Sequence, residues 1–204
     1  MLKYNSSSTL LWEYDCFDYN QALSVISPVV DQFGNIIISG RVNIPQYVTY
    51  QYRWEAPLLA KISASGILVW DTIYFPNSLT SSGVDIVNDL KIDINGNIFI
   101  CGATQHGSLT SLCGEYGGVH WSYDAFLAKF STAGVQLWDT IYGNLTDFDD
   151  IFVGIGLDNS GNCYVTGYSY TVRCSSSGHF TDFLTIKYNP NGSQLWLRNN
   201  GDSL

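Results

Sequence analysis

The sequence has few charged residues, and its single methionine is residue 1. Charged side chains make up 13% of the 204 residues, whereas about 25% is typical of soluble domains. Acidic residues dominate, with a formal net charge of -9, and this argues against nucleic acid as a partner because phosphate binding needs clustered Lys and Arg. No long apolar run and no charged-then-apolar leader occurs, so we expect no membrane span.

Several motifs that carry chemistry are also missing. No Cys-x-x-Cys occurs among the five cysteines, so the usual zinc and redox spacings are absent. No nucleophile–base pair, paired carboxylates or Gly-rich phosphate loop stands out, and we therefore predict no catalytic residue, no metal and no cofactor. No segment shows a sustained 3.6-residue apolar period with caps, so helix should be nearly absent.

What the sequence does contain is an internal repeat. Lys is followed nine residues later by Trp in four segments: KYNSSSTLLW at 3–12, KISASGILVW at 61–70, KFSTAGVQLW at 129–138 and KYNPNGSQLW at 187–196. The steps from one Lys to the next are 58, 68 and 58 residues. Self-similarity at such a period indicates a repeat architecture in which each repeat is one supersecondary unit.

A second element, Asp-x-x-Gly-Asn, lies between these segments at 31–35, 93–97 and 158–162. Each copy reaches a further glycine nine residues after its Asp, at Gly40, Gly102 and Gly167. Short apolar runs flank both kinds of element, so each predicts a hairpin, with Asp bonding its own backbone and Gly supplying positive φ. The first Lys-to-Trp segment has Ser8 where the others have Gly, and its turn is less well specified.

Two hairpins per repeat give four antiparallel strands, which is the composition of a β-propeller blade. We therefore predict an all-β domain over 1–204, with an N-terminal half-blade hairpin at 1–20 and three four-stranded blades at 25–74, 87–142 and 153–198. Three blades do not close a ring, since propellers have four to eight. We expect a fragment of a longer propeller, a ring completed by oligomerisation, or a less regular barrel-like packing.

The segment DAFLAKFSTAGVQLWDTIYGNLTDFDDIFVGIGLDNSGNCYVTGYS at 124–169 resembles the bacterial β-propeller repeat family often labelled SBBP. The resemblance covers nearly the whole chain, although RWEAP at 53–57 departs from the usual entry to the third strand. Members are typically parts of large secreted or surface proteins of bacteria, mostly without a known activity. The resemblance thus implies an extracellular or cell-surface location, and it names no ligand.

Two weaker similarities remain as alternatives. Gln-x-Trp at 136–138 and 194–196 resembles the repeat of ricin-type trefoil lectins, but the repeats of this chain are longer than a trefoil repeat and the disulfide pattern is missing. Gly-Asp-Ser-Leu at 201–204 matches a hydrolase signature, yet it lacks the preceding strand and α/β context which that chemistry needs. The propeller interpretation accounts for more of the chain than either.

The strand order places the short turns at one edge of every blade and the long loops at the other, where binding usually occurs. The candidate ligand-binding residues of the long loops are Tyr52, Trp54, His106, Tyr116, His120, Trp121, Tyr170 and His179. Aromatic rings with polar neighbours suit sugar or peptide binding, although they can equally pin the loops to the sheets. Other options at this edge are calcium at Asp147, Asp149 and Asp150, a disulfide between Cys113 and Cys174, and a metal site shared by these cysteines and the histidines.

The sequence therefore predicts a non-catalytic scaffold or binding module of a bacterial surface or secreted protein. The alternative is a lectin-like module that binds glycans, and a more distant one is a glycan-active enzyme domain, because fold does not imply function. The expected partners are a second copy or the remainder of a longer propeller, together with a glycan or protein ligand.

Overall fold

A computed structural model describes residues 1–14, 22–26, 28–43, 55–76, 83–108, 120–143, 149–172 and 179–200. The regular structure in these ranges is entirely β-strand, which confirms the prediction of an all-β chain. None of these ranges contains a helix that could cross a membrane.

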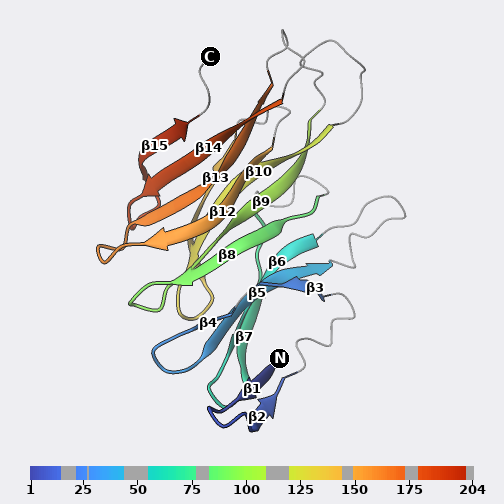
Figure 1. Cartoon of the computed structure of the whole chain (residues 1–204), viewed down its shortest axis with the longest axis vertical. Coiled ribbons are helices and arrows are strands. Elements are labelled where there is room, and N and C mark those ends of the chain that lie inside the picture. The colour runs from blue at the N-terminus through green and yellow to red at the C-terminus, as the bar shows by residue number, and fades with distance from the viewer. Residues whose placement is uncertain are drawn as a thin grey trace.

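The strands form four antiparallel sheets, numbered I to IV, which follow one another in chain order along the molecule (Figure 1). Sheet I is β1 (Leu2–Tyr4) and β2 (Leu10–Glu13); sheet II is β3 (Ala22–Val25), β4 (Val29–Val30), β5 (Ile36–Asn43), β6 (Glu55–Ile62) and β7 (Leu68–Ile73). Sheet III is β8 (Ile86–Ile92), β9 (Ile98–Ser108), β10 (His120–Phe130) and β11 (Gln136–Tyr142). Sheet IV is β12 (Asp150–Leu157), β13 (Cys163–Val172), β14 (His179–Tyr188) and β15 (Gln194–Asn200). The strands of sheets III and IV pair in sequence order, and the described strands form no closed ring.

The Asp-x-x-Gly-Asn segments form tight turns that their own side chains stabilise. In the first, the carboxylate of Asp31 accepts the backbone N–H groups of Phe33 and Asn35, both at 2.9 Å. Gly34 supplies the positive φ of 78° that such a turn needs. The same bonds recur at the two later copies, so these turns are specified locally by the sequence, as predicted.

The glycine nine residues after each Asp has a structural cause. The first strand of each of sheets II, III and IV carries a bulge at this level, and the glycine of the neighbouring strand lies against the bulged backbone. A Cβ added to Gly102 would lie 1.8 Å from the carbonyl oxygen of Ile86, and one added to Gly167 would lie 1.9 Å from that of Ile151. Only glycine fits there, which explains the fixed spacing of the motif.

Apolar side chains fill the space between successive sheets. The layer between sheets I and II contains Met1, Trp12, Ile36, Ile38, Ala60 and Ile62. The layer between II and III contains Ile37, Leu59, Trp70, Tyr74, Ile98, Ile100, Phe126 and Phe130. The layer between III and IV contains Phe99, Cys101, Leu127, Trp138, Phe152, Cys163, Val165, Leu184 and Ile186. Because side chains alternate along a strand, sheets II and III bury both faces.

One contact recurs at all three junctions between sheets. The indole N–H of Trp12 donates to the carbonyl oxygen of Ala64 in the β6–β7 turn, at 3.1 Å. Trp70 does the same to Thr132 at 3.1 Å, and Trp138 to Pro190 at 3.0 Å. Trp12, Trp70 and Trp138 thus each pack between one sheet and the next.

Candidate functional site

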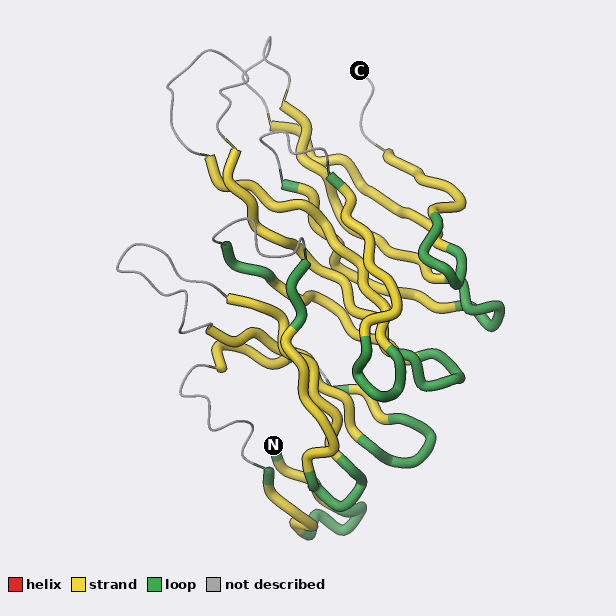
Figure 2. Tube along the Cα trace, turned by 180° about the vertical axis from the view of Figure 1, so that it is seen from behind, coloured by secondary structure: helices red, strands yellow, loops and turns green. Residues whose placement is uncertain are grey.

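Five of the eight residues predicted to bind a ligand are described, and they lie on β9, β10, β13 and β14, at the ends of these strands away from the short turns (Figure 2). Three of the eight, Tyr52, Trp54 and Tyr116, are outside the described residues. Asp147, Cys113 and Cys174, which the calcium and disulfide options need, are outside them as well. Where side chains are described, no group of three or more His, Cys, Asp or Glu is arranged to hold a metal ion.

Four other predicted residues lie on strands, which corrects their expected placement in loops. His106 is on β9, His120 and Trp121 are on β10, and His179 begins β14. The β9–β10 ladder continues to the pair between His120 and Ser108, so backbone pairing extends well beyond the apolar core. The sequence could not show this, because these strand ends lack the apolar alternation by which strands are recognised.

Tyr170 is the one predicted residue whose side chain is described. It lies on β13 and is 36% exposed, and its ring meets that of Tyr168 edge-on with centroids 5.5 Å apart. The backbone N–H of Tyr170 donates to the carbonyl oxygen of Asp149 at 2.9 Å, and the carboxylate of Asp149 accepts the backbone N–H of Tyr123 at 3.0 Å. Asp149 therefore ties sheets III and IV together at this edge.

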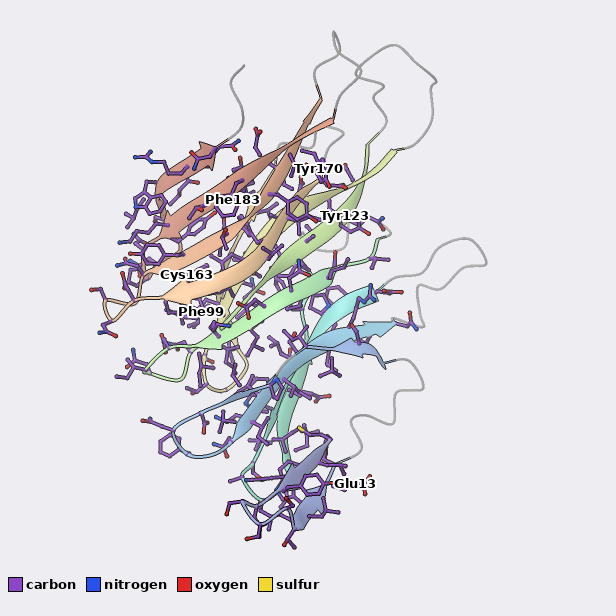
Figure 3. The ribbon with its side chains drawn as sticks, viewed as in Figure 1. Glu13, Phe99, Tyr123, Cys163, Tyr170 and Phe183 are labelled. Atoms are coloured by element: carbon purple, nitrogen blue, oxygen red, sulfur yellow. The ribbon has the colours of Figure 1, made fainter. Side chains whose placement is uncertain are left out.

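Sheet IV turns one face toward sheet III and the other, its outer face, away from it (Figure 3). Five aromatic side chains belong to the outer face: Tyr164, Tyr168, Tyr170, Phe183 and Trp196. Phe183 is 57% exposed and Trp196 is 36% exposed. Exposed aromatic rings with charged neighbours are typical of binding surfaces.

The end of this face nearest the turns carries an aromatic and ionic group. Lys187 pairs with Tyr164 on one side and Trp196 on the other, and its Nζ lies 4.8 Å from the Tyr164 ring centroid. The same Nζ lies 3.8 Å from a carboxylate oxygen of Asp158. A hydrogen bond from Asn162 lowers the pKa of Asp158 to about 2, and the interaction with Tyr164 raises the pKa of Lys187. Both groups are charged at neutral pH.

A second polar group lies between sheets II and III, near the loop edge. Arg41 and Glu55 form an ion pair at 2.9 Å, and the side-chain amide of Gln105 donates to the hydroxyl of Tyr123 at 3.3 Å. Burial raises the pKa of Asp85 to about 7, although hydrogen bonds to Thr104 and Gln105 oppose the rise. Such a carboxyl can hold or release a proton near neutral pH.

Two clefts of similar size lie at the turn edge, one between sheets II and III and one between sheets III and IV. The first, of about 330 Å³, is lined by the turns around Asp31 and Asp93 and by Lys61. The second, of about 340 Å³, is lined by the turns around Asp93 and Asp158 and by Lys129. The sequence analysis predicted binding at the opposite edge and missed these clefts. The signal that could have revealed them is an apolar side chain at a turn position: Ile94 is 85% exposed and Phe33 is 73% exposed.

No protein-family model matches the chain, and no curated protein matches it in sequence. The similarity to the bacterial propeller repeats therefore stays a prediction that rests on the quoted motifs.

Proposed function

We propose that the chain is a non-catalytic scaffold built from β-propeller-type repeats, which presents its loop edge and open sheet face to a ligand. The observation that carries this proposal is the junction that recurs three times, in which an indole donates to a turn of the next sheet. A repeated junction of this kind makes a rigid array, and rigid arrays with variable edges are common binding scaffolds.

The contacts of the innermost strands support the propeller form. Between β8 and β12, the side-chain amide of Asn88 donates to the carbonyl oxygen of Phe152 at 2.8 Å. The carboxylate of Asp89 accepts the backbone N–H of Ile155 at 2.9 Å. These direct bonds bring the first strands of neighbouring sheets side by side, as in blades arranged around a common axis.

The proposed setting, a secreted or surface protein of bacteria, is supported only by the resemblance of 124–169 to that repeat family. The low fraction of charged residues and the abundance of aromatic residues are compatible with this setting.

A glycan-binding module is the second candidate, and Tyr170 favours it. The Tyr168 and Tyr170 rings stand at the loop edge, 5.5 Å apart and edge-on, with Phe183 opposite Tyr168 on the adjacent strand. Aromatic faces stack on the apolar faces of sugar rings, while tyrosine hydroxyls hydrogen-bond to sugar hydroxyls. Trp121, Tyr116 and the three histidines of the loop edge belong to the same proposal.

The experiment that tests both candidates compares the full chain with Tyr170→Ala and Trp121→Ala on a glycan microarray, with folding checked by circular dichroism. Signals that both variants lose without unfolding would establish the lectin-like module. If no chain gives a signal and no arrayed glycan is hydrolysed, the result supports the non-catalytic scaffold. Glycan turnover that a single Asp or His substitution abolishes would overturn the scaffold proposal in favour of an enzyme.

A further inference from the structure

Each internal junction has a donor side and a turn side. The donor side is a tryptophan, and the turn side is the next Lys-to-Trp turn, in which a glycine lies directly against the indole. A Cβ added to Gly66 would lie 2.7 Å from the Trp12 ring, and one added to Gly134 or Gly192 would lie 2.8 Å from Trp70 or Trp138. Real Cβ atoms do not approach this closely, so the junction requires glycine at this position of the turn.

The outer face of sheet IV presents a fourth donor side. Trp196 occupies the position of Trp138 one repeat later, beside Lys187 in place of Lys129. Trp196 is 36% exposed, and no described residue accepts its indole N–H. The face differs from the internal ones in having Thr185 where sheet III has Leu127, so a sheet docked here would meet a more polar surface.

Sheet I presents an unpaired turn side. Leu2 and Tyr4 are 49% and 53% exposed, whereas their equivalents in sheet IV, Ile186 and Tyr188, are 0% and 2% exposed. The two open faces are thus the complementary halves of the junction that the chain uses internally. Such complementary faces would join copies of the chain head to tail into rings or filaments.

The turn of sheet I, however, carries Ser8 at the position of the glycines. Ser8 has a φ of 59°, which lies in the same left-handed region as the φ values of Gly66, Gly134 and Gly192. Its Cβ therefore occupies the space that the indole fills at every internal junction. A second copy cannot bring this turn against Trp196 without a shift of the ring or of the turn.

We propose that the outer face of sheet IV around Trp196 is a docking surface for a further sheet of this repeat that has glycine in its turn. We also propose that Ser8 prevents sheet I of a second copy from docking there. The partner is defined by three features: a carbonyl acceptor at the second turn position, glycine at the fourth, and apolar residues like Ile186 and Tyr188 behind them. This inference rests on the stacking of repeats proposed above.

The test converts sheet I into such a partner. Ser8→Gly removes the Cβ, and Ser8→Ala is the matched control because it removes the hydroxyl and keeps the Cβ. The molar mass of each full chain is measured by light scattering after size exclusion over a wide range of concentrations. We expect the wild type and Ser8→Ala to stay monomeric, and Ser8→Gly to associate at least about tenfold more tightly than Ser8→Ala.

A second substitution shows whether the association uses the proposed surface. In the Ser8→Gly chain, Trp196→Phe removes the indole N–H and Trp196→Ala removes the ring, and we expect the first to weaken association and the second to abolish it. A monomeric Ser8→Gly chain would overturn the inference, as would a wild-type chain that associates through Trp196 as tightly as Ser8→Gly.

Failure of this inference is separable from failure of the scaffold proposal. Trp138→Phe removes the same donor from an internal junction, and its effect on unfolding is independent of association. If Trp138→Phe destabilises the chain while Ser8→Gly stays monomeric, the internal stacking holds and only the docking surface is refuted. If Trp138→Phe has no effect, the repeated junction itself does not stabilise the array.

Discussion

The two faces of sheet IV have the same strands and the same pairing, yet their side chains differ sharply. Adjacent residues of β14 show this best: Leu184 on the inner face is 0% exposed, and Phe183 on the outer face is 57% exposed. The inner face packs against sheet III in a continuous apolar layer. The outer face keeps the tryptophan and lysine of the repeat but replaces an internal leucine by Thr185.

The comparison shows which repeat positions serve the sheet and which serve the junction. Lys187 and Trp196 pair across β14 and β15 whether or not a sheet covers them, as Lys129 and Trp138 do across β10 and β11. Burial, in contrast, depends on the presence of a neighbouring sheet. Substitutions on the two faces of sheet IV should therefore have very different effects on the free energy of unfolding.

The largest expected difference is between two glycines of sheet IV. Gly167→Ala places a Cβ 1.9 Å from the backbone oxygen of Ile151, and β12 and β13 must move apart to admit it. We expect a loss of about 3 kcal/mol or more, at the upper end of overpacking effects. Gly156→Ala is the control, because its nearest contact would be an ordinary 3.9 Å from Tyr164. Urea denaturation measures both, and equal effects would refute the explanation of the Gly spacing.

The next comparison is between neighbouring side chains of β14. Leu184→Ala leaves a cavity between sheets III and IV, and we expect a loss of about 2–5 kcal/mol. Phe183→Ala removes a ring from the outer face, and we expect a loss below about 1 kcal/mol. Thermal and urea unfolding of the two variants provide the check, and a large effect of Phe183→Ala would show that something covers the outer face.

A smaller difference should separate two tryptophans in equivalent positions. Trp138→Phe removes the hydrogen bond to the carbonyl oxygen of Pro190, and we expect a loss of about 0.5–1.5 kcal/mol. Trp196→Phe, in the chain with native Ser8, should change the free energy of unfolding by no more than about 0.5 kcal/mol. Chemical denaturation at several protein concentrations distinguishes this result from association, which would make the stability concentration-dependent.

The most specific difference concerns pH. Burial between sheets II and III raises the pKa of Asp85 from 3.8 to about 7. The folded chain therefore keeps this proton up to a higher pH than the unfolded chain does. This group therefore favours folding most below pH 4, and its contribution falls as the pH rises from about 4 to about 7. Asp85→Asn should remove that fall, which stability measurements across this range would detect.

The contribution of Asp158, on the open turn edge, to the free energy of unfolding should change with pH in the opposite direction. A hydrogen bond from Asn162 lowers its pKa from 3.8 to about 2, so its contribution is present above pH 4 and is lost as the pH falls toward 2. Asp158→Asn should leave the profile between pH 4 and 7 unchanged. If both variants altered the same pH range, the assignment of the two carboxyls would be wrong.

Much of the local structure could be predicted from the sequence because it depends on neighbours in the chain. The turn at Asp93 is stabilised by the bonds of its carboxylate to the backbone of Asn95 and Asn97, all within five residues. Gly102 was visible as a fixed spacing, although its reason, the bulged backbone beside Ile86, was not. The extension of β9 through His106 could not be predicted, since only pairing with β10 holds it.

The sequence by itself determined the tight turns and the hairpins that they close, because Asp, Asn and Ser side chains bond their own backbone and glycine alone adopts the required φ readily. It could not determine which copy of the repeat is buried. Trp138 and Trp196 are each the last residue of a QLW motif. Trp138 nevertheless donates to Pro190 between two sheets, whereas Trp196 lies on an exposed face. Tertiary structure decided this, because burial depends on the sheet that packs against a residue, as the turn at Gly192 packs against the Trp138 ring.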